Sequence, residues 1–102
     1  MTEHIALSFP AQVPIGRRAH VGVVASGDLE VLLEPLEGKL AEVAVHTKVA
    51  GYRMTWEAVF ERFFARYPYA LRLEIRDYGA TPGMVWLRLV QAMEHAGKNG
   101  EQ

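Results

Sequence analysis

The chain has 102 residues, of which 50% are hydrophobic and 23% are charged, and its formal net charge is −1. This length supports one domain, large enough to bury a core without disulfides or metals. The near-neutral charge provides no field that would attract nucleic acid or an anionic membrane. The sequence has no cysteine, which excludes disulfides, thiolate metal sites and a cysteine nucleophile and predicts a reducing compartment, the cytoplasm.

The N-terminal half has the composition of β-structure. Residues 1–16 contain two prolines and a glycine, and we expect an irregular lead-in with at most one short strand near Ile5–Phe9. The segments Ala19–Ala25 and Leu29–Pro35 are strand-like, and residues 26–28 between them have the composition of a hairpin turn. Residues 37–39 form a second turn. The alternation over 41–49 then predicts a half-buried strand, with Val43, Val45, Thr47 and Val49 on its inner side.

The C-terminal half alternates between helix and strand. Thr55 is the expected N-cap of a helix that Pro68 stops, and its aromatic stripe predicts a core face rather than a cofactor pocket. Residues 70–77 alternate strictly and predict a strand. Thr81-Pro82 is a strong helix start, and we expect that helix to run to about Ala96 and to end at Gly97, followed by a frayed tail over 97–102.

The predicted element order is (β)-β-β-β-α-β-α within one domain spanning 1–102. Runs of strands combined with two helices are typical of an α+β fold. We therefore expect an antiparallel or mixed sheet of four to five strands, with both helices packed on one of its faces.

The sequence lacks the standard catalytic motifs. It has no glycine-rich phosphate loop and no G-x-S-x-G elbow. A Ser–His–Asp set can be assembled on paper from Ser26, His20 and Asp28, but nothing in their spacing supports it. The histidines show no metal-ligand spacing and are expected at the surface or with local partners; they are His4, His20, His46 and His95.

Ser26 is the candidate functional residue. Its hydroxyl is expected at an exposed hairpin tip between the small residues Ala25 and Gly27, carried on rigid strands, as an attachment point for a modifying enzyme requires. Asp28 could orient that enzyme or bind its metal. From the residues alone, ordinary turn chemistry remains the favoured interpretation of Ser-Gly-Asp.

Three segments carry a family resemblance. Residues 25–35 (ASGDLEVLLEP) resemble the prosthetic-group segment of the malonate decarboxylase acyl carrier protein, the delta subunit. Similar segments follow in order, at Trp56-Glu57 with Arg62–Phe64 and from Leu73 to Gly83. The resemblance extends from about Arg18 to Met93. Ala25 departs from it, because many relatives have glycine before the serine. The family is similar in role to the citrate lyase acyl carrier (gamma) chain.

The resemblance implies a non-catalytic carrier subunit of a biotin-independent decarboxylase. It implies that Ser26 bears 2′-(5″-phosphoribosyl)-3′-dephospho-CoA through a phosphodiester, with Gly27 and Asp28 as neighbouring contacts. The thiol of this arm holds a malonyl and then an acetyl thioester. The implied partners are a transferase (alpha) subunit, decarboxylase (beta and gamma) subunits and a prosthetic-group transferase, the holo-carrier synthase. Arg17 and Arg18 could meet the arm's phosphates, or lie in a solvated lead-in.

Two other functions stay open at this point. A non-covalent regulatory or assembly subunit of a multienzyme complex would bind its partners independently of Ser26. A small hydrolase would turn over esters as an isolated chain, and only with Ser26 present.

Overall fold

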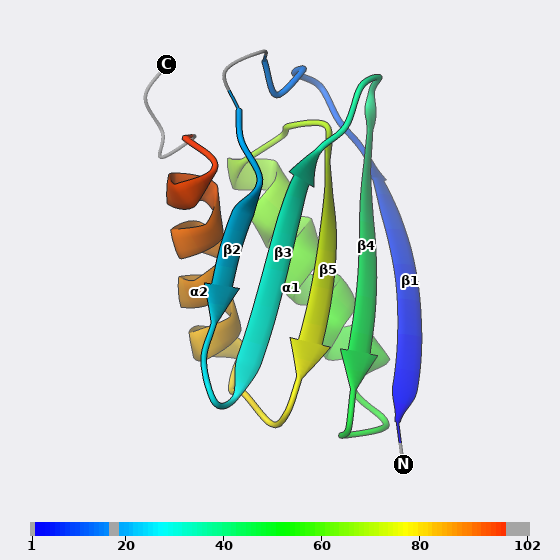
Figure 1. The fold of residues 1–102 in the computed structure, drawn as a ribbon. Coiled ribbons are helices and arrows are strands. Elements are labelled where there is room, and N and C mark those ends of the chain that lie inside the picture. The colour runs from blue at the N-terminus through cyan, green and yellow to red at the C-terminus, as the bar shows by residue number, and fades with distance from the viewer. Residues whose placement is uncertain (1, 17–18, 98–102) are drawn as a thin grey trace.

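The computed structural model describes residues 2–16 and 19–97. Within these residues the chain forms five strands and two helices (Figure 1). They are β1 (Glu3–Pro10), β2 (Gly22–Ala25), β3 (Leu29–Pro35), β4 (Leu40–Thr47), α1 (Arg53–Arg66), β5 (Leu71–Asp77) and α2 (Pro82–His95).

The strands form one mixed sheet in the order β1-β4-β5-β3-β2. The β2/β3 hairpin is antiparallel, and so are the β1/β4 and β3/β5 pairs. The β4/β5 pair is parallel, because α1 connects the two strands as a crossover. The predicted α+β class and element order are therefore confirmed.

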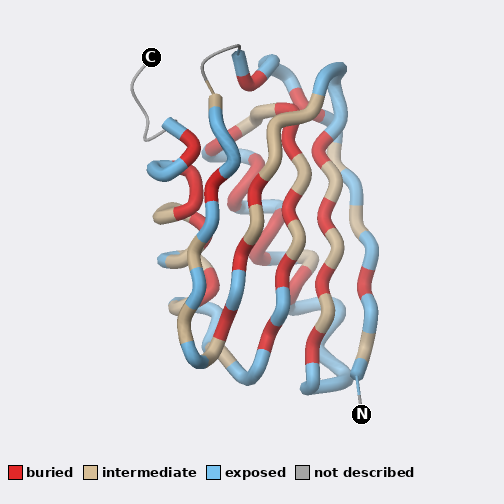
Figure 2. Tube along the Cα trace, in the orientation of Figure 1, coloured by how far each residue is buried: buried red, intermediate tan, exposed pale blue. Residues whose placement is uncertain are grey.

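Both helices cover the same face of the sheet and bury its apolar side chains (Figures 1 and 2). The inner faces of the three central strands are buried as their alternation predicts. The aromatic stripe of α1 packs into the same core, so its interpretation as a core face is confirmed. The core includes Leu29, Val31, Leu33, Val43, Val45, Trp56, Phe60, Phe63, Leu71, Leu73, Ile75, Leu89 and Met93.

The opposite face of the sheet is polar and carries no helix. Arg72 lies near Glu34 and Glu42 on the flanking strands, at 4.0 and 3.7 Å. His46 lies 3.3 Å from Glu74 and contacts His4 through their Nδ1 atoms at 2.9 Å. The histidines His4 and His46 thus have local partners, as expected, although their contact with each other was not predicted.

Two strands, β1 and β2, differ most from the expectation in their bounds. β1 spans Glu3–Pro10 and pairs with β4 along its whole length, so much of the expected irregular lead-in is an edge strand. A strand at the edge tolerates Pro10, which has no amide hydrogen to donate. Conversely, β2 begins only at Gly22, later than the expected start at residue 19.

The predicted cap of α1 is wrong. The helix begins at Arg53, its N-cap is Tyr52, and no side chain caps it. Gly51 has φ +93°, which turns the chain before Thr55 is reached, and Arg53 pairs with Glu57 at 3.1 Å to support the first turn.

At the start of α2 the prediction is confirmed. Thr81 Oγ1 accepts a hydrogen bond from the Met84 amide at 3.2 Å, and Pro82 is the first helical residue. α2 ends at His95, followed by Ala96 and then by Gly97 with positive φ. In the described part of the chain, neither helix is long and apolar enough to cross a membrane.

Candidate functional site

The Ser26 turn joins β2 to β3 and is held by backbone hydrogen bonds. The Ser26 amide donates to the Leu29 carbonyl at 2.9 Å, which closes the turn. The Asp28 carbonyl accepts from the Tyr78 amide at 3.0 Å, which ties the turn to the β5–α2 loop. These two bonds fix the backbone on both sides of the hydroxyl-bearing residue.

The Ser26 hydroxyl is half-buried rather than exposed, which corrects the expectation of a free tip. It donates to Asp28 Oδ1 at 2.6 Å, with the Leu29 carbonyl as a second, longer acceptor at 3.0 Å. The neighbours Ala25 and Gly27 are exposed as predicted. The hydroxyl turns inward because a carboxylate two residues away offers it a stronger partner than water does.

Arg88 is the third member of the site and was not predicted. It lies on α2, 62 residues from Ser26, and its Nε donates to the Ser26 hydroxyl oxygen at 3.3 Å. Its other contact is to Gln91, at 3.3 Å. The only sequence signal was a cation one position before Leu89, which is buried, on the second predicted helix.

The contacts of the Ser26 turn favour the ionised form of Asp28 and lower the pKa of its carboxyl. The hydrogen bond from Ser26 is the main cause that lowers the pKa of the Asp28 carboxyl below its ordinary value. Partial burial acts in the opposite direction, and the Asp28 backbone amide and the charge of Arg88 add smaller lowering effects. Because the folded-state pKa is depressed, the stabilisation from this carboxylate is present at neutral pH and is lost as pH falls through that pKa.

Ser26→Ala is expected to raise the pKa of Asp28 towards its ordinary value, because the substitution removes the largest lowering contact. Arg88→Gln should raise it by less. The measurement is the pH titration of the Asp28 carboxyl carbon by NMR in the wild type and in both variants. An equal or larger effect of Arg88→Gln would contradict this ranking.

Three loops meet at the end of the domain that carries Ser26 (Figure 1). Besides the Asp28–Tyr78 contact, the Lys48 amide donates to the Asp77 carbonyl at 3.2 Å. The Lys48 ammonium also lies 5.5 Å from the Tyr78 ring centroid. The Ser26 turn is therefore one part of a connected loop layer.

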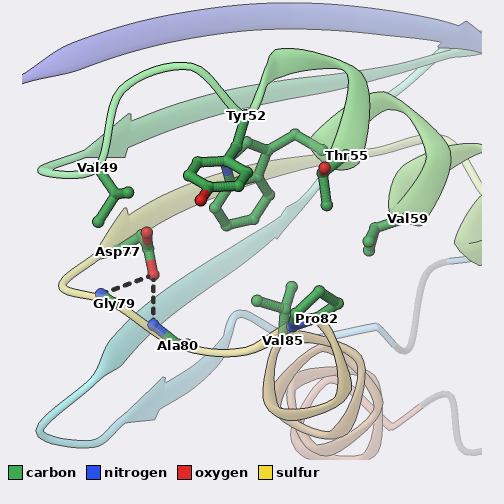
Figure 3. A pocket seen from close by; sticks show the side chains of 10 residues that line it. Val49, Tyr52, Thr55, Val59, Asp77, Gly79, Ala80, Pro82 and Val85 are labelled. Atoms are coloured by element: carbon green, nitrogen blue, oxygen red, sulfur yellow. Dashed lines mark hydrogen bonds between the residues drawn. The ribbon is translucent and has the colours of Figure 1, made fainter.

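An apolar cavity of about 380 Å³ opens beside this layer, between the starts of α1 and α2 (Figure 3). Tyr52, Trp56 and Val85 contribute to its walls, with Gly79 and Ala80 of the β5–α2 loop along one side. Thr55, the residue expected to cap α1, lines the cavity instead. Part of the aromatic stripe of α1 thus borders a cavity as well as the core.

The remaining candidate residues are His20, Arg17 and Arg18. Arg17 and Arg18 lie outside the described residues. The contacts of the Ser26 hydroxyl in the described chain are to Asp28, Leu29 and Arg88, so His20 does not complete a catalytic triad. Within the same residues, no group of three or more His, Asp or Glu side chains is placed to hold a metal ion.

The geometry defines a small β-rich domain that presents one serine hydroxyl between a carboxylate and a guanidinium. Residues 16–96 match the family model described as malonate decarboxylase delta subunit (MdcD). The chain therefore belongs to the malonate decarboxylase acyl carrier protein family, and the resemblance found in the sequence is confirmed.

Individual relatives agree with the family model. The malonate decarboxylase acyl carrier protein of Azotobacter vinelandii is 50% identical over 93 residues, which cover 90% of this chain and 94% of that protein. The protein of the same name from Pseudomonas savastanoi is 52% identical, covering 93% and 97%. Among solved structures, a chain in the crystal structure of a Pseudomonas malonate decarboxylase hetero-tetramer in complex with malonate matches with a TM-score of 0.79 and 44% identity. That match covers 93% of this chain and 99% of the other.

Proposed function

We propose that this chain is the acyl carrier subunit of a biotin-independent malonate decarboxylase, and that Ser26 is where 2′-(5″-phosphoribosyl)-3′-dephospho-CoA is attached. The similarity to acyl carrier proteins over nearly the whole chain carries this proposal. The similar chain in a hetero-tetramer supports partner subunits for this one. The partners that we propose are a transferase (alpha) subunit, decarboxylase (beta and gamma) subunits and the transferase that loads the prosthetic group.

The residues around Ser26 fit a group joined through a phosphodiester. Arg88 supplies a positive charge at the hydroxyl oxygen, where a phosphate would stand. A Cβ placed on Gly27 meets no atom within 4 Å, so the turn has open space beside the serine. The rigid hairpin holds the attachment point, and tethering raises the effective concentration of a carried group at partner sites.

The group would supply the thiol that the chain lacks, and that thiol carries malonyl and then acetyl as thioesters while partner subunits transacylate and decarboxylate. The sequence contains no cysteine. In the described chain, Ser26 has no histidine base. Both observations support a carrier role in which this subunit contributes no catalytic group to decarboxylation.

Co-expression with the prosthetic-group transferase is expected to add the mass of the phosphoribosyl-dephospho-CoA arm to the wild-type chain, and Ser26→Ala should abolish that gain. The measurement is intact-protein mass spectrometry. Ser8→Ala is the matched control, because Ser8 is the other serine in the sequence and lies exposed on β1. This variant should gain the mass as the wild type does. An unmodified wild-type chain, or a gain that survives Ser26→Ala, would refute the attachment site.

A further inference from the structure

The Ser26 hydroxyl is paired with two charged groups before any modification. It donates to Asp28 Oδ1 at 2.6 Å, within the range of charge-assisted O–H···O⁻ hydrogen bonds. Its oxygen accepts from Arg88 Nε at 3.3 Å. Asp28 is thus placed to receive the hydroxyl proton. Arg88 lies where the negative charge of an incoming phosphate would stand.

The surroundings hold this arrangement in place. Asp28 belongs to the same closed turn as Ser26, and the Tyr78 amide anchors its carbonyl. Arg88 reaches the turn from α2, which is packed into the core through Val85, Leu89 and Met93. Ordinary turn chemistry explains the Ser26–Asp28 contact alone. It does not explain an arginine from a distant helix directed at the hydroxyl oxygen.

We propose that the chain contributes to its own loading, with Asp28 as the catalytic residue that accepts the Ser26 proton and Arg88 as the contact for the incoming phosphate. This inference rests on the proposed function, since it concerns how Ser26 receives its group. It assigns roles in the loading reaction to two residues of the carrier, in addition to those of the loading enzyme.

The step is a phosphoryl transfer from a phosphoric anhydride form of the arm. The Ser26 Oγ–P bond forms as the P–O bond to the anhydride leaving group breaks, and the leaving group departs with the bonding electron pair. The hydroxyl proton passes to Asp28 Oδ1 and then to solvent. The Arg88 guanidinium balances negative charge on the phosphate oxygens during the transfer. A carboxylate that accepts the proton of an attacking hydroxyl is an established element of phosphoryl transfer.

The test measures loading rates by intact mass, with the carrier as the varied substrate of the prosthetic-group transferase. Asp28→Asn keeps the shape and a hydrogen-bond acceptor but cannot take the proton. It is expected to lower kcat about 100-fold, while KM changes by less than about threefold. Asp28→Glu restores a carboxylate and should recover at least about tenfold of that loss. Arg88→Gln should lower kcat/KM about tenfold.

Glu30→Gln is the matched control, because Glu30 is an exposed carboxylate at the start of β3 and is not among the hydrogen-bond partners of the Ser26 hydroxyl in the described chain, which are Asp28, Leu29 and Arg88. It should load at the wild-type rate. Thermal unfolding of every variant checks that the fold is retained.

Three results would overturn the inference: Asp28→Asn loading as fast as the wild type, Asp28→Glu as slow as Asp28→Asn, or a loss confined to KM. Any of these, with the wild type still loaded at Ser26, leaves the proposed function intact. A wild-type chain that is never loaded refutes the proposed function together with this inference.

Discussion

Gly22→Ala is expected to destabilise the domain by about 3 kcal/mol, at the upper end of the cost of over-packing, and to lower Tm by roughly 10 to 20 °C. A Cβ on Gly22 would lie 2.3 Å from the carbonyl oxygen of Ala92 on α2 and 3.3 Å from the Ala96 amide nitrogen. Both are backbone atoms, so no side chain can rotate away. The helix itself would have to move from the edge strand.

The loss of stability expected for Gly22→Ala is informative, because backbone entropy alone predicts a gain. Replacing a glycine by alanine in a compatible conformation stabilises a protein by about 0.4–1 kcal/mol. The clash should outweigh this gain, since β2 is also tied to α2 by His95 Nδ1 donating to the Val23 carbonyl at 2.8 Å. The His20 amide adds a bond to the Ala96 carbonyl at 3.1 Å. The helix therefore cannot shift without straining other contacts.

Gly27→Ala is the matched control for Gly22→Ala. Gly27 lies in the exposed turn that follows the same strand, and a Cβ there meets no atom within 4 Å. Its stability should change by less than about 0.5 kcal/mol. The measurement is urea unfolding of both variants. If Gly22→Ala proves as stable as Gly27→Ala, β2 and α2 do not approach as closely as the structure places them.

The sequence predicts which side chains of a strand face the core, because successive side chains point to opposite faces of the sheet. Leu29, Val31 and Leu33 alternate with polar residues, and all three are buried as the alternation requires. Val49 fails as a member of the β4 inner face because the strand ends at Thr47, leaving Val49 39% exposed. The order of the strands followed no such rule. β5 lies between β3 and β4, and this placement depends on long-range pairing with both of those strands.

In the candidate site, too, the sequence predicts the local contact but not the long-range one. Ser26 and Asp28 are two residues apart, so the composition of the turn is enough to predict that they lie together. Arg88 joins them only because the β2/β3 hairpin packs against α2, which no local pattern reports. The sequence therefore predicts Ser26 as the candidate residue but not the guanidinium of Arg88 opposite it.

Asp77 accepts hydrogen bonds from the loop beside the Ser26 turn. It is only 4% exposed, at the end of β5. Its Oδ2 accepts from the Thr47 hydroxyl at 2.7 Å, and its Oδ1 accepts from the amides of Gly79 and Ala80 at 3.1 and 2.9 Å. These amides belong to the loop whose Tyr78 amide holds the Asp28 carbonyl. Asp77 thus supports the site through the loop rather than by direct contact.

Asp77→Ala should therefore cost about 3 kcal/mol, since it leaves one hydroxyl and two amides without their acceptor. Asp77→Asn keeps one acceptor oxygen and should cost about 1 kcal/mol. Asp28→Asn, at the other aspartate in the sequence, is the control and should destabilise the domain less than Asp77→Ala does, because Asp28 is only half-buried. Urea unfolding measures the stability of all three variants.

Hydrogen exchange at the Tyr78 and Gly79 amides measures how firmly the loop is held. Unchanged exchange in Asp77→Ala would show that Asp77 does not hold the loop. If exchange rises at these loop amides and at the Ser26 amide, the anchoring of the Ser26 turn depends on this buried carboxylate.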